Sequence, residues 1–189
     1  MGQDHPRDQP RSLPMTAYAL LGLLSFGDPL TGYELKQRAD RTLRYYWVSP
    51  AMSQVYSELE RLSDLGLVRR HGDDRTTSYS LTRAGTATLT HWLRETPVGF
   101  PVLKHPVALR LLLGALVDPE SVTSMLREHL MALEKERADL EKVRVSLQGE
   151  DQTGEPFHYP ALVADWGLSY FDHERTIIED LLDRIENDA

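Results

Sequence analysis

Residues 47–82 bring a helix, a helix stop and two strand-like segments together, and this order constrains the fold more than any other feature of the chain. Apolar side chains at helical spacing predict a helix over residues 50–65 that ends at Gly66. These side chains are Met52, Val55, Leu59 and Leu62. The alternating segments 67–71 and 76–82 predict two strands of a hairpin, with a turn rich in glycine and aspartate between them.

Two further helices are predicted before this stretch. Residues 15–25 are apolar nearly all round, which is typical of a buried helix. Thr31 followed by Glu34 has the spacing of a capping box and predicts a helix over residues 32–40. We expect the aromatic segment 41–48 to pack on the core as a connection.

Capping residues mark two more helix starts in this half of the chain. Ser49 and Pro50 have the residue types of an N-cap and a first helical position. Thr82 predicts the cap of a fourth helix, which extends to about Glu95. The side chains that we expect this helix to bury are Leu89, Trp92 and Leu93.

Three helices followed by a hairpin is the order of elements in a winged helix-turn-helix. A helix fits the major groove of B-DNA, and a hairpin beside it can reach phosphates or the minor groove. The outward face of the third helix carries Ser53, Gln54 and Ser57, and glutamine can pair with adenine through two hydrogen bonds. The hairpin side chains expected at phosphates are Arg69, Arg70, His71 and Arg75. The alternative is that all these groups are ordinary solvated side chains.

The second half of the chain is predicted to be helical. Residues 97–106 contain three prolines and indicate a domain boundary. A short apolar helix is expected over 107–117, a long one from the Asp118-Pro119 cap to about residue 147, and a last one over 161–186. The domains predicted are therefore a disordered arm (1–12), a winged helix-turn-helix (13–97) and a C-terminal helical dimerisation domain (98–189). The fold class is mainly α with one small β-hairpin.

The long helix carries leucines at every seventh position, namely Leu126, Leu133, Leu140 and Leu147. A leucine zipper is disfavoured, because Arg137 and Arg144 occupy the partner positions of the seam. We interpret the leucines as one side of a dimer interface shared with the last helix. Packing inside one protomer is the alternative.

Charge is distributed unevenly along the chain. Residues 1–97 carry 12 basic and 11 acidic residues, a net charge of +1, whereas residues 98–189 carry 9 and 18, a net charge of −9. An acidic chain repels nucleic acid, but a local basic face on a near-neutral domain is sufficient to bind it. A second hypothesis is a winged-helix interaction module whose acidic helices dock a basic protein and which binds no DNA.

Several classes of function are disfavoured. The chain has no cysteine, so disulfides, thiol nucleophiles and cysteine-ligated zinc are excluded. No two of the seven histidines are four residues apart, as a metal-binding pair on one helix face would be, and we expect no metal site. No phosphate-binding glycine loop or nucleophile motif is present, so neither an enzyme nor a cofactor is expected. The apolar run 13–26 is too short to cross a membrane and lacks a basic leader, which favours a cytoplasmic protein.

The chain resembles the PadR family of bacterial transcriptional regulators, in the subgroup with a long C-terminal helical domain of virulence-activator type. Three segments carry the resemblance, AYALLGLLSFGDPLTGYELKQR (17–38), YYWVSPAMSQVYSELERLSDLGLV (45–68) and YSLTRAG (79–85). One departure is Ser53, at a position where the family often has glycine. The C-terminal helices match only in length, order and acidity.

The resemblance implies a homodimeric repressor that binds a pseudo-palindromic operator, dimerises through its C-terminal helices and is relieved by a small molecule. It implies phosphate contacts for Tyr33 and Lys36, and a role divided between core and phosphate for Tyr56. We also expect Thr77 at the DNA. The aromatic side chains of Trp92, Trp166 and Tyr170 are candidate contacts for a small hydrophobic effector, although aromatic residues at helical spacing more often belong to a core or an interface.

Overall fold

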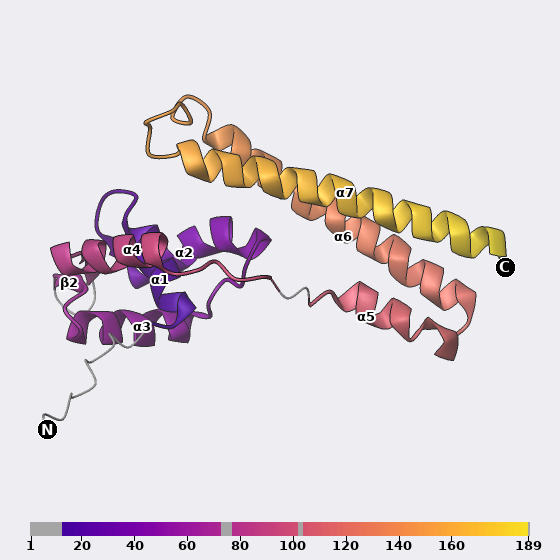
Figure 1. The fold of residues 1–189 in the computed structure, drawn as a ribbon, viewed down its shortest axis with the longest axis horizontal. Helices are drawn as coiled ribbons and strands as arrows, with labels where there is room; N and C mark the ends of the chain where they lie inside the picture. Colours follow the sequence, from indigo (N-terminus) through magenta and orange to yellow (C-terminus); the bar gives the residue numbers. More distant parts are fainter. Residues whose placement is uncertain (1–12, 73–76, 102–103, 189) are drawn as a thin grey trace, which may run out of the picture. The chain divides into compact units, whose positions relative to one another are not determined.

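The computed structural model describes residues 13–72, 77–101 and 104–188. Its contacts divide the chain into two compact units, Met1–Val98 and Gly99–Ala189. Figure 1 shows a small helical and stranded unit at the N-terminal side and a helical unit at the C-terminal side. Each described helix is too short or too polar to span a lipid bilayer.

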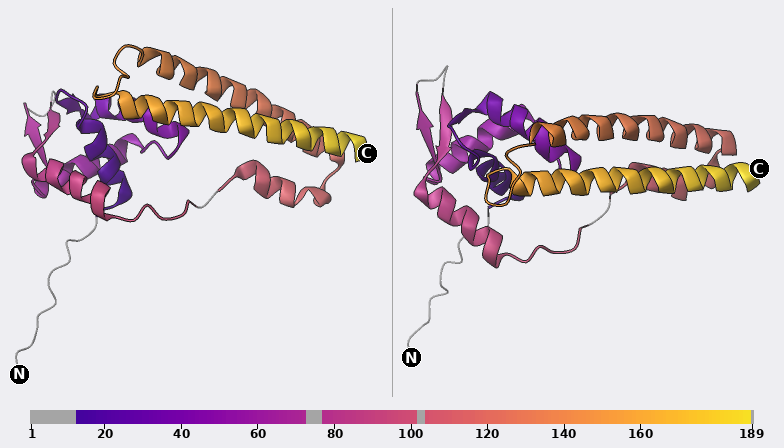
Figure 2. Two further views of the ribbon diagram at one scale, coloured as in Figure 1. Left: turned by 45° about the horizontal axis from the view of Figure 1, so that its top comes forward. Right: turned by 90° about the horizontal axis from the view of Figure 1, so that it is seen from above.

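The N-terminal unit has the winged helix-turn-helix order of elements. Its elements are α1 (Met15–Leu24), β1 (Leu30–Thr31), α2 (Gly32–Thr42), the 3-10 turn η1 (Leu43–Tyr45), α3 (Met52–Asp64), β2 (Val68–His71), β3 (Ser78–Leu81) and α4 (Arg83–Glu95). The strands form an antiparallel sheet in the order β1-β3-β2, and Figure 2 shows the hairpin of β2 and β3 projecting from the helices. The predicted fold class is confirmed.

The core of this unit is formed by buried apolar side chains from several elements. Leu20, Leu35 and Leu59 are inaccessible to solvent, and they come from α1, α2 and α3 respectively. Burying a leucine side chain stabilises a fold by about 1.5–3 kcal/mol, so this contact between three helices holds α3 in a fixed orientation. The core also includes Tyr79 from β3 and Leu89 from α4.

The expected helix caps are found where threonine or aspartate was present. Thr31 Oγ1 accepts a hydrogen bond from the Glu34 amide at 3.2 Å, and Glu34 Oε2 accepts one from the Thr31 amide at 2.8 Å. Thr82 Oγ1 accepts from the Gly85 amide at 3.0 Å. Asp118 Oδ1 accepts from the Ser121 amide at 2.8 Å. Three of the predicted helix starts are therefore confirmed at the atomic level.

The predicted start of the third helix is wrong by two residues. Helix α3 begins at Met52, because Ser49 is engaged elsewhere and its Oγ donates to Asp40 Oδ1 at 2.6 Å. The end of this helix is as expected. Gly66 adopts φ +68°, and the Leu67 amide donates to the Leu62 carbonyl at 2.9 Å, as in a Schellman motif.

The aromatic connection packs on the core through Leu43, as expected, but its Trp47 and Val48 are exposed. Leu93, expected to be buried near the end of α4, is also exposed, whereas Trp92 is half-buried. Strand β1 was not predicted. It has only two residues, which pair with Tyr79 and Ser78 of β3, and such a short segment has no periodicity to detect.

The C-terminal unit is built on two long helices. Its elements are α5 (Pro106–Leu112), the 3-10 turn η2 (Gly114–Leu116), α6 (Pro119–Ser146) and α7 (His158–Asp188). Helices α6 and α7 lie side by side along their length in all views of Figures 1 and 2. Val107 of α5 joins the apolar cluster that these two helices form at one end.

The leucine series of α6 is already covered inside one protomer. Leu126, Leu133 and Leu140 are buried in the isolated chain. Their interpretation as a dimer interface is therefore wrong, and the alternative of packing within one protomer is correct. The arginines that interrupt the series are satisfied within the chain as well, because Arg137 Nε donates to Asp172 and Arg144 Nε to Asp165, each at 2.7 Å.

Helix α7 only partly buries the face that its large apolar side chains predict. The helical spacing of these side chains predicts one buried side, formed by Trp166, Tyr170, Ile177, Leu181 and Ile185. Trp166, Tyr170 and Ile177 are exposed, whereas Leu181 and Ile185 are partly buried against the apolar cluster. The buried positions of α7 are Ala161, Ala164, Gly167, Glu174, Ile178 and Leu182. The buried residues in the first turns of α7 are small and let the leucines of α6 approach its backbone closely. The buried face is therefore the one whose side chains fit against α6, and not the one with the most aromatic residues.

Candidate nucleic-acid interface

The first two turns of α3 present a polar and uncharged surface. Ser53, Gln54 and Ser57 are exposed, whereas Val55 on the opposite face is fully buried. Residues 50–57 carry no charged side chain. The first acidic residue of the helix, Glu58, accepts a hydrogen bond from Arg61 Nε at 3.0 Å. A phosphate backbone could therefore approach this end of α3 without meeting an unpaired carboxylate.

Gln54 has a structural role in addition to its exposure. Its Oε1 accepts a hydrogen bond from the Ala51 amide at 2.9 Å, and so closes the first turn of α3 where the N-cap residue itself offers no side-chain acceptor. Two-point pairing with adenine needs both the oxygen and the nitrogen of the amide. Gln54 must give up or share the Ala51 contact to make that pairing. No pattern of residue types indicates this competition.

Tyr56 packs on the start of α2. A Cβ atom placed on Gly32 would lie 2.5 Å from Tyr56 Cε1, so the ring occupies the space that any larger residue at position 32 would need. The Tyr56 side chain remains 48% exposed. Tyr56 thus combines packing on Gly32 with an exposed part of its ring, and its expected contact with a phosphate stays a prediction.

Tyr33 and Lys36 of α2, the two residues expected at phosphates, differ in their freedom to reach one. Tyr33 is exposed, and its hydroxyl accepts a hydrogen bond from Gln37 Nε2 at 2.9 Å. Lys36 is half-buried and forms an ion pair with Asp40, and its Nζ lies 3.4 Å from Ser49 Oγ. Its ammonium group and the Ser49 hydroxyl hold the pKa of Asp40 below its usual value. Lys36 must therefore leave this internal pair to contact DNA.

The hairpin distributes its basic residues over both faces of the sheet. Arg69 lies opposite Ser80 and Arg70 opposite Tyr79, and adjacent residues of a strand point to opposite faces. His71 is on the Arg69 face, where its Nε2 lies 2.7 Å from Ser80 Oγ. Arg69 and Arg70 are both exposed, and their side chains leave opposite faces of the sheet. Thr77 is half-buried before β3, and Arg75 lies outside the described residues.

The three aromatic residues considered for an effector are distributed over both units. Trp92, in the N-terminal unit, stacks on Tyr18 with ring centroids 4.6 Å apart and planes inclined by 12°. Trp166 and Tyr170 lie on the exposed side of α7. Partial burial and the nearby Glu174 carboxylate raise the pKa of the Tyr170 hydroxyl.

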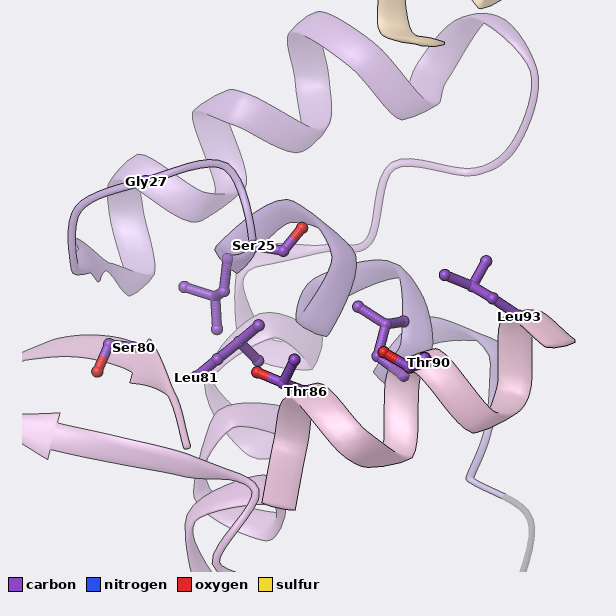
Figure 3. Close-up of a pocket in the computed structure, with 9 residues that line it drawn as sticks. Ser25, Gly27, Ser80, Leu81, Thr86, Thr90 and Leu93 are labelled. Atoms are coloured by element: carbon purple, nitrogen blue, oxygen red, sulfur yellow. The ribbon is translucent and has the colours of Figure 1, made fainter. Parts of the chain in front are cut away.

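A pocket of the N-terminal unit lies between the end of α1, β3 and α4 (Figure 3). Its wall combines leucines with the hydroxyl groups of Ser25, Ser80, Thr86 and Thr90. None of the three aromatic residues lines this pocket. The exposed Leu93 does, so this side chain borders the pocket rather than the core.

Two family models match the chain in succession. Residues 20–91 match the transcriptional regulator PadR-like family, and residues 103–186 match the virulence activator alpha C-terminal domain. No curated protein matches the chain significantly.

Solved structures share the fold at low sequence identity. PadR of Bacillus subtilis in complex with operator DNA is 23% identical and has a TM-score of 0.79, covering 92% of this chain and 99% of that one. The same protein in complex with p-coumaric acid is 24% identical with a TM-score of 0.75, covering 90% and 98%. The Vibrio cholerae virulence activator AphA is 20% identical with a TM-score of 0.71, covering 92% and 99%.

Proposed function

This chain belongs to the PadR-like family of transcriptional regulators, and from that premise we propose that it is a homodimeric repressor that binds a pseudo-palindromic DNA operator and releases it when a small molecule binds. It would act in the cytoplasm. The family is one of regulators and not of enzymes, in agreement with the sequence analysis. The observation that carries the proposal is the exposed, uncharged first half of α3 on a rigid core.

In this proposal Ser53, Gln54 and Ser57 meet base edges in the major groove, and exposed arginines of β2 meet phosphates. Tyr33 and Tyr56 contact the backbone from the junction of α2 and α3, with contributions from Lys36, His71, Arg75 and Thr77. Phosphate contacts set affinity and orientation, whereas the α3 contacts set sequence preference. Two copies of α3 would enter major grooves about one helical turn apart.

The decisive experiment begins with selection of bound duplexes from a random pool, followed by fluorescence anisotropy titrations on the selected site. Gln54→Ala should weaken specific binding by about 1–3 kcal/mol and relax preference at one base pair. Gln148→Ala, the same change at an exposed position of the C-terminal unit, should leave binding unchanged. A failure of selection to enrich any duplex, together with co-purification of a protein partner, would favour the interaction-module hypothesis.

Because Gln54 also closes the first turn of α3, its two roles must be separated. In the double variant Ala51→Ser/Gln54→Ala, serine supplies a new N-cap acceptor while the base contact stays absent. We expect the double variant to recover thermal stability but not sequence preference. Recovery of sequence preference as well would mean that Gln54 acts only as a cap.

Dimerisation is proposed to use the exposed apolar side chains of α5 and α7, since the α6 leucines are already covered. These side chains include Leu109, Leu112, Leu162, Val163, Trp166 and Ile177. Large exposed apolar patches mark interaction surfaces. In sedimentation velocity, Leu112→Glu and Leu162→Glu should shift the chain from dimer to monomer, whereas Ser124→Glu on the exposed side of α6 should not. A chain that is monomeric without any substitution would refute this part of the proposal.

The effector is proposed to be a small hydrophobic molecule, with Trp166 and Tyr170 as candidate contacts. For Trp92 only the ring face that does not stack on Tyr18 remains available. The Bacillus subtilis structure with p-coumaric acid makes that compound a suitable first probe. Titration of the protein–DNA complex should release the duplex as tryptophan fluorescence changes. The Trp166→Phe variant should bind the compound more weakly than the unmodified chain. If the compound releases the duplex but binds both chains equally well, it contacts another part of the protein.

A further inference from the structure

Three side chains that are far apart in the sequence converge inside the C-terminal unit. His105 precedes α5, His129 lies in the middle of α6, and Glu174 lies in the middle of α7. Glu174 Oε1 is 2.8 Å from His105 Nε2 and 3.3 Å from His129 Nε2. The two imidazole rings meet edge to face, with centroids 5.5 Å apart at 81°. One nitrogen or oxygen atom from each residue lies within 4.8 Å of the others.

The burial of Glu174 calls for a positive charge. The residue is only 9% exposed, and within the described part of the chain its carboxylate pairs with the two histidines rather than with a lysine or arginine. A buried carboxylate is costly unless it is paired with a cation or coordinates a metal. Neutral imidazoles can donate hydrogen bonds to a carboxylate but cannot balance its charge, whereas a bound metal ion coordinates the carboxylate and balances its charge.

We propose that His105, His129 and Glu174 bind a divalent first-row transition metal ion, with zinc as the best fit. Two imidazole nitrogens and one carboxylate oxygen form a known three-ligand set for zinc, which leaves one coordination position for water. Zinc bonds of about 2.0–2.1 Å in a tetrahedron place neighbouring ligand atoms about 3.3 Å apart. The distances from Glu174 Oε1 to the two imidazole nitrogens, 2.8 Å and 3.3 Å, are close to that spacing.

Metal binding competes with a helix cap. His105 Nδ1 accepts a hydrogen bond from the Ala108 amide at 3.2 Å, so the ring proton lies on Nε2 and is donated to Glu174. A neutral imidazole that coordinates through Nε2 carries its proton on Nδ1, and a protonated Nδ1 cannot accept a hydrogen bond from the Ala108 amide. The ion therefore exchanges the N-cap of α5 for a cross-link between α5, α6 and α7.

The experiment uses the full-length chain without an affinity tag, first stripped with EDTA. Zinc titration against a chromogenic chelator should give one bound zinc per chain. Cobalt should give the visible absorption of a four- or five-coordinate nitrogen and oxygen site. The midpoint of thermal unfolding should rise with zinc, because an ion that binds only the folded state stabilises it. Magnesium should have none of these effects.

Matched variants locate the site. His129→Gln and Glu174→Gln should weaken zinc binding at least tenfold and abolish the cobalt absorption. His105→Asn should do the same while it preserves folding, because asparagine is a favoured N-cap and can accept from the Ala108 amide. His173→Gln, an exposed histidine beside Glu174 in the sequence, should bind zinc as the unmodified chain does.

Two results would overturn the proposal. One is a chain that binds no zinc at micromolar concentration. The other is zinc binding that is equally strong in the unmodified chain, His129→Gln and His105→Asn, which would place the ion elsewhere. If Glu174→Gln fails to fold by circular dichroism, His129→Gln and His105→Asn decide the outcome. None of these measurements depends on DNA binding.

Discussion

Gly85 occupies a place where the fold has no room for a side chain. It lies in the first turn of α4, and a Cβ atom there would be 2.1 Å from the carbonyl oxygen of Leu67. The same carbonyl oxygen accepts hydrogen bonds from the amide and the hydroxyl of Thr82, both at 3.1 Å. Gly85→Ala would therefore push apart the joint between the hairpin and α4.

The size of the effect can be worked out from these contacts. Cβ atoms essentially never approach other atoms closer than 3.0 Å, so the Leu67 backbone must move by about 0.9 Å. Such overpacking costs about 1–3 kcal/mol, and weakening the Thr82 hydrogen bonds adds about 1 kcal/mol. The better helix propensity of alanine offsets about 1 kcal/mol of this loss in stability. We expect Gly85→Ala to lower the free energy of unfolding by about 2 kcal/mol.

Gly22 supplies a control with the opposite sign. It lies inside α1, and a Cβ atom added to it would meet no atom of another described element within 4 Å, so Gly22→Ala should stabilise the unit by about 0.5–1 kcal/mol. Both variants can be measured by urea unfolding, followed through the near-ultraviolet circular dichroism of the stacked Tyr18 and Trp92. Stabilisation by Gly85→Ala, or equal effects of the two changes, would refute the steric argument.

Three further outcomes are expected. Arg70→Ala should weaken binding equally on all duplexes and reduce the salt dependence by about one phosphate, measured by anisotropy at several salt concentrations; a changed base preference would contradict a phosphate contact. Leu140→Ala should lower the free energy of unfolding by about 2–5 kcal/mol in urea, because the side chain is fully buried in one chain; a loss of dimer without a loss of stability would contradict this. Hydrogen bonds from Ser121 lower the pKa of Asp118, and hydrogen bonds from Arg137 lower the pKa of Asp172. The two carboxylates therefore stabilise the fold above the usual pKa range of aspartate, and this stabilisation is lost as the pH falls through the lowered pKa values. Urea unfolding between pH 6 and about pH 2 should show a falling free energy of unfolding, and a constant value would contradict the prediction.

Local signals in the sequence were reliable where a single interaction decides the structure. Thr31, Thr82 and Asp118 each carry an oxygen that satisfies an amide three residues on, and all three are caps. Ser49 failed as a cap because Asp40, nine residues earlier, binds its hydroxyl. The cap at the start of α3 comes instead from inside the helix, through Gln54. A pattern of residue types cannot reveal which of two partners a hydroxyl group selects.

Packing between helices was harder to predict. The spacing of the α6 leucines correctly indicated one apolar face, but not whether another helix of the same chain or a second protomer covers it. The buried face of α7 is marked by small residues such as Ala164 and Gly167, which carry little hydrophobic signal. The cluster of His105, His129 and Glu174 was missed because its members come from three elements, and no short motif joins them.

Thr31 joins parts of the N-terminal unit that have different tasks. It ends β1, where it pairs with Ser78 of the hairpin, and it caps α2. The next residue, Gly32, is covered by the ring of Tyr56 from α3. Two consecutive residues thus keep the hairpin, α2 and α3 in register, while Ser53 and Ser57 lie outside this junction. If α3 reads DNA as proposed, exchanging its outward side chains would change the target sequence and leave this frame intact.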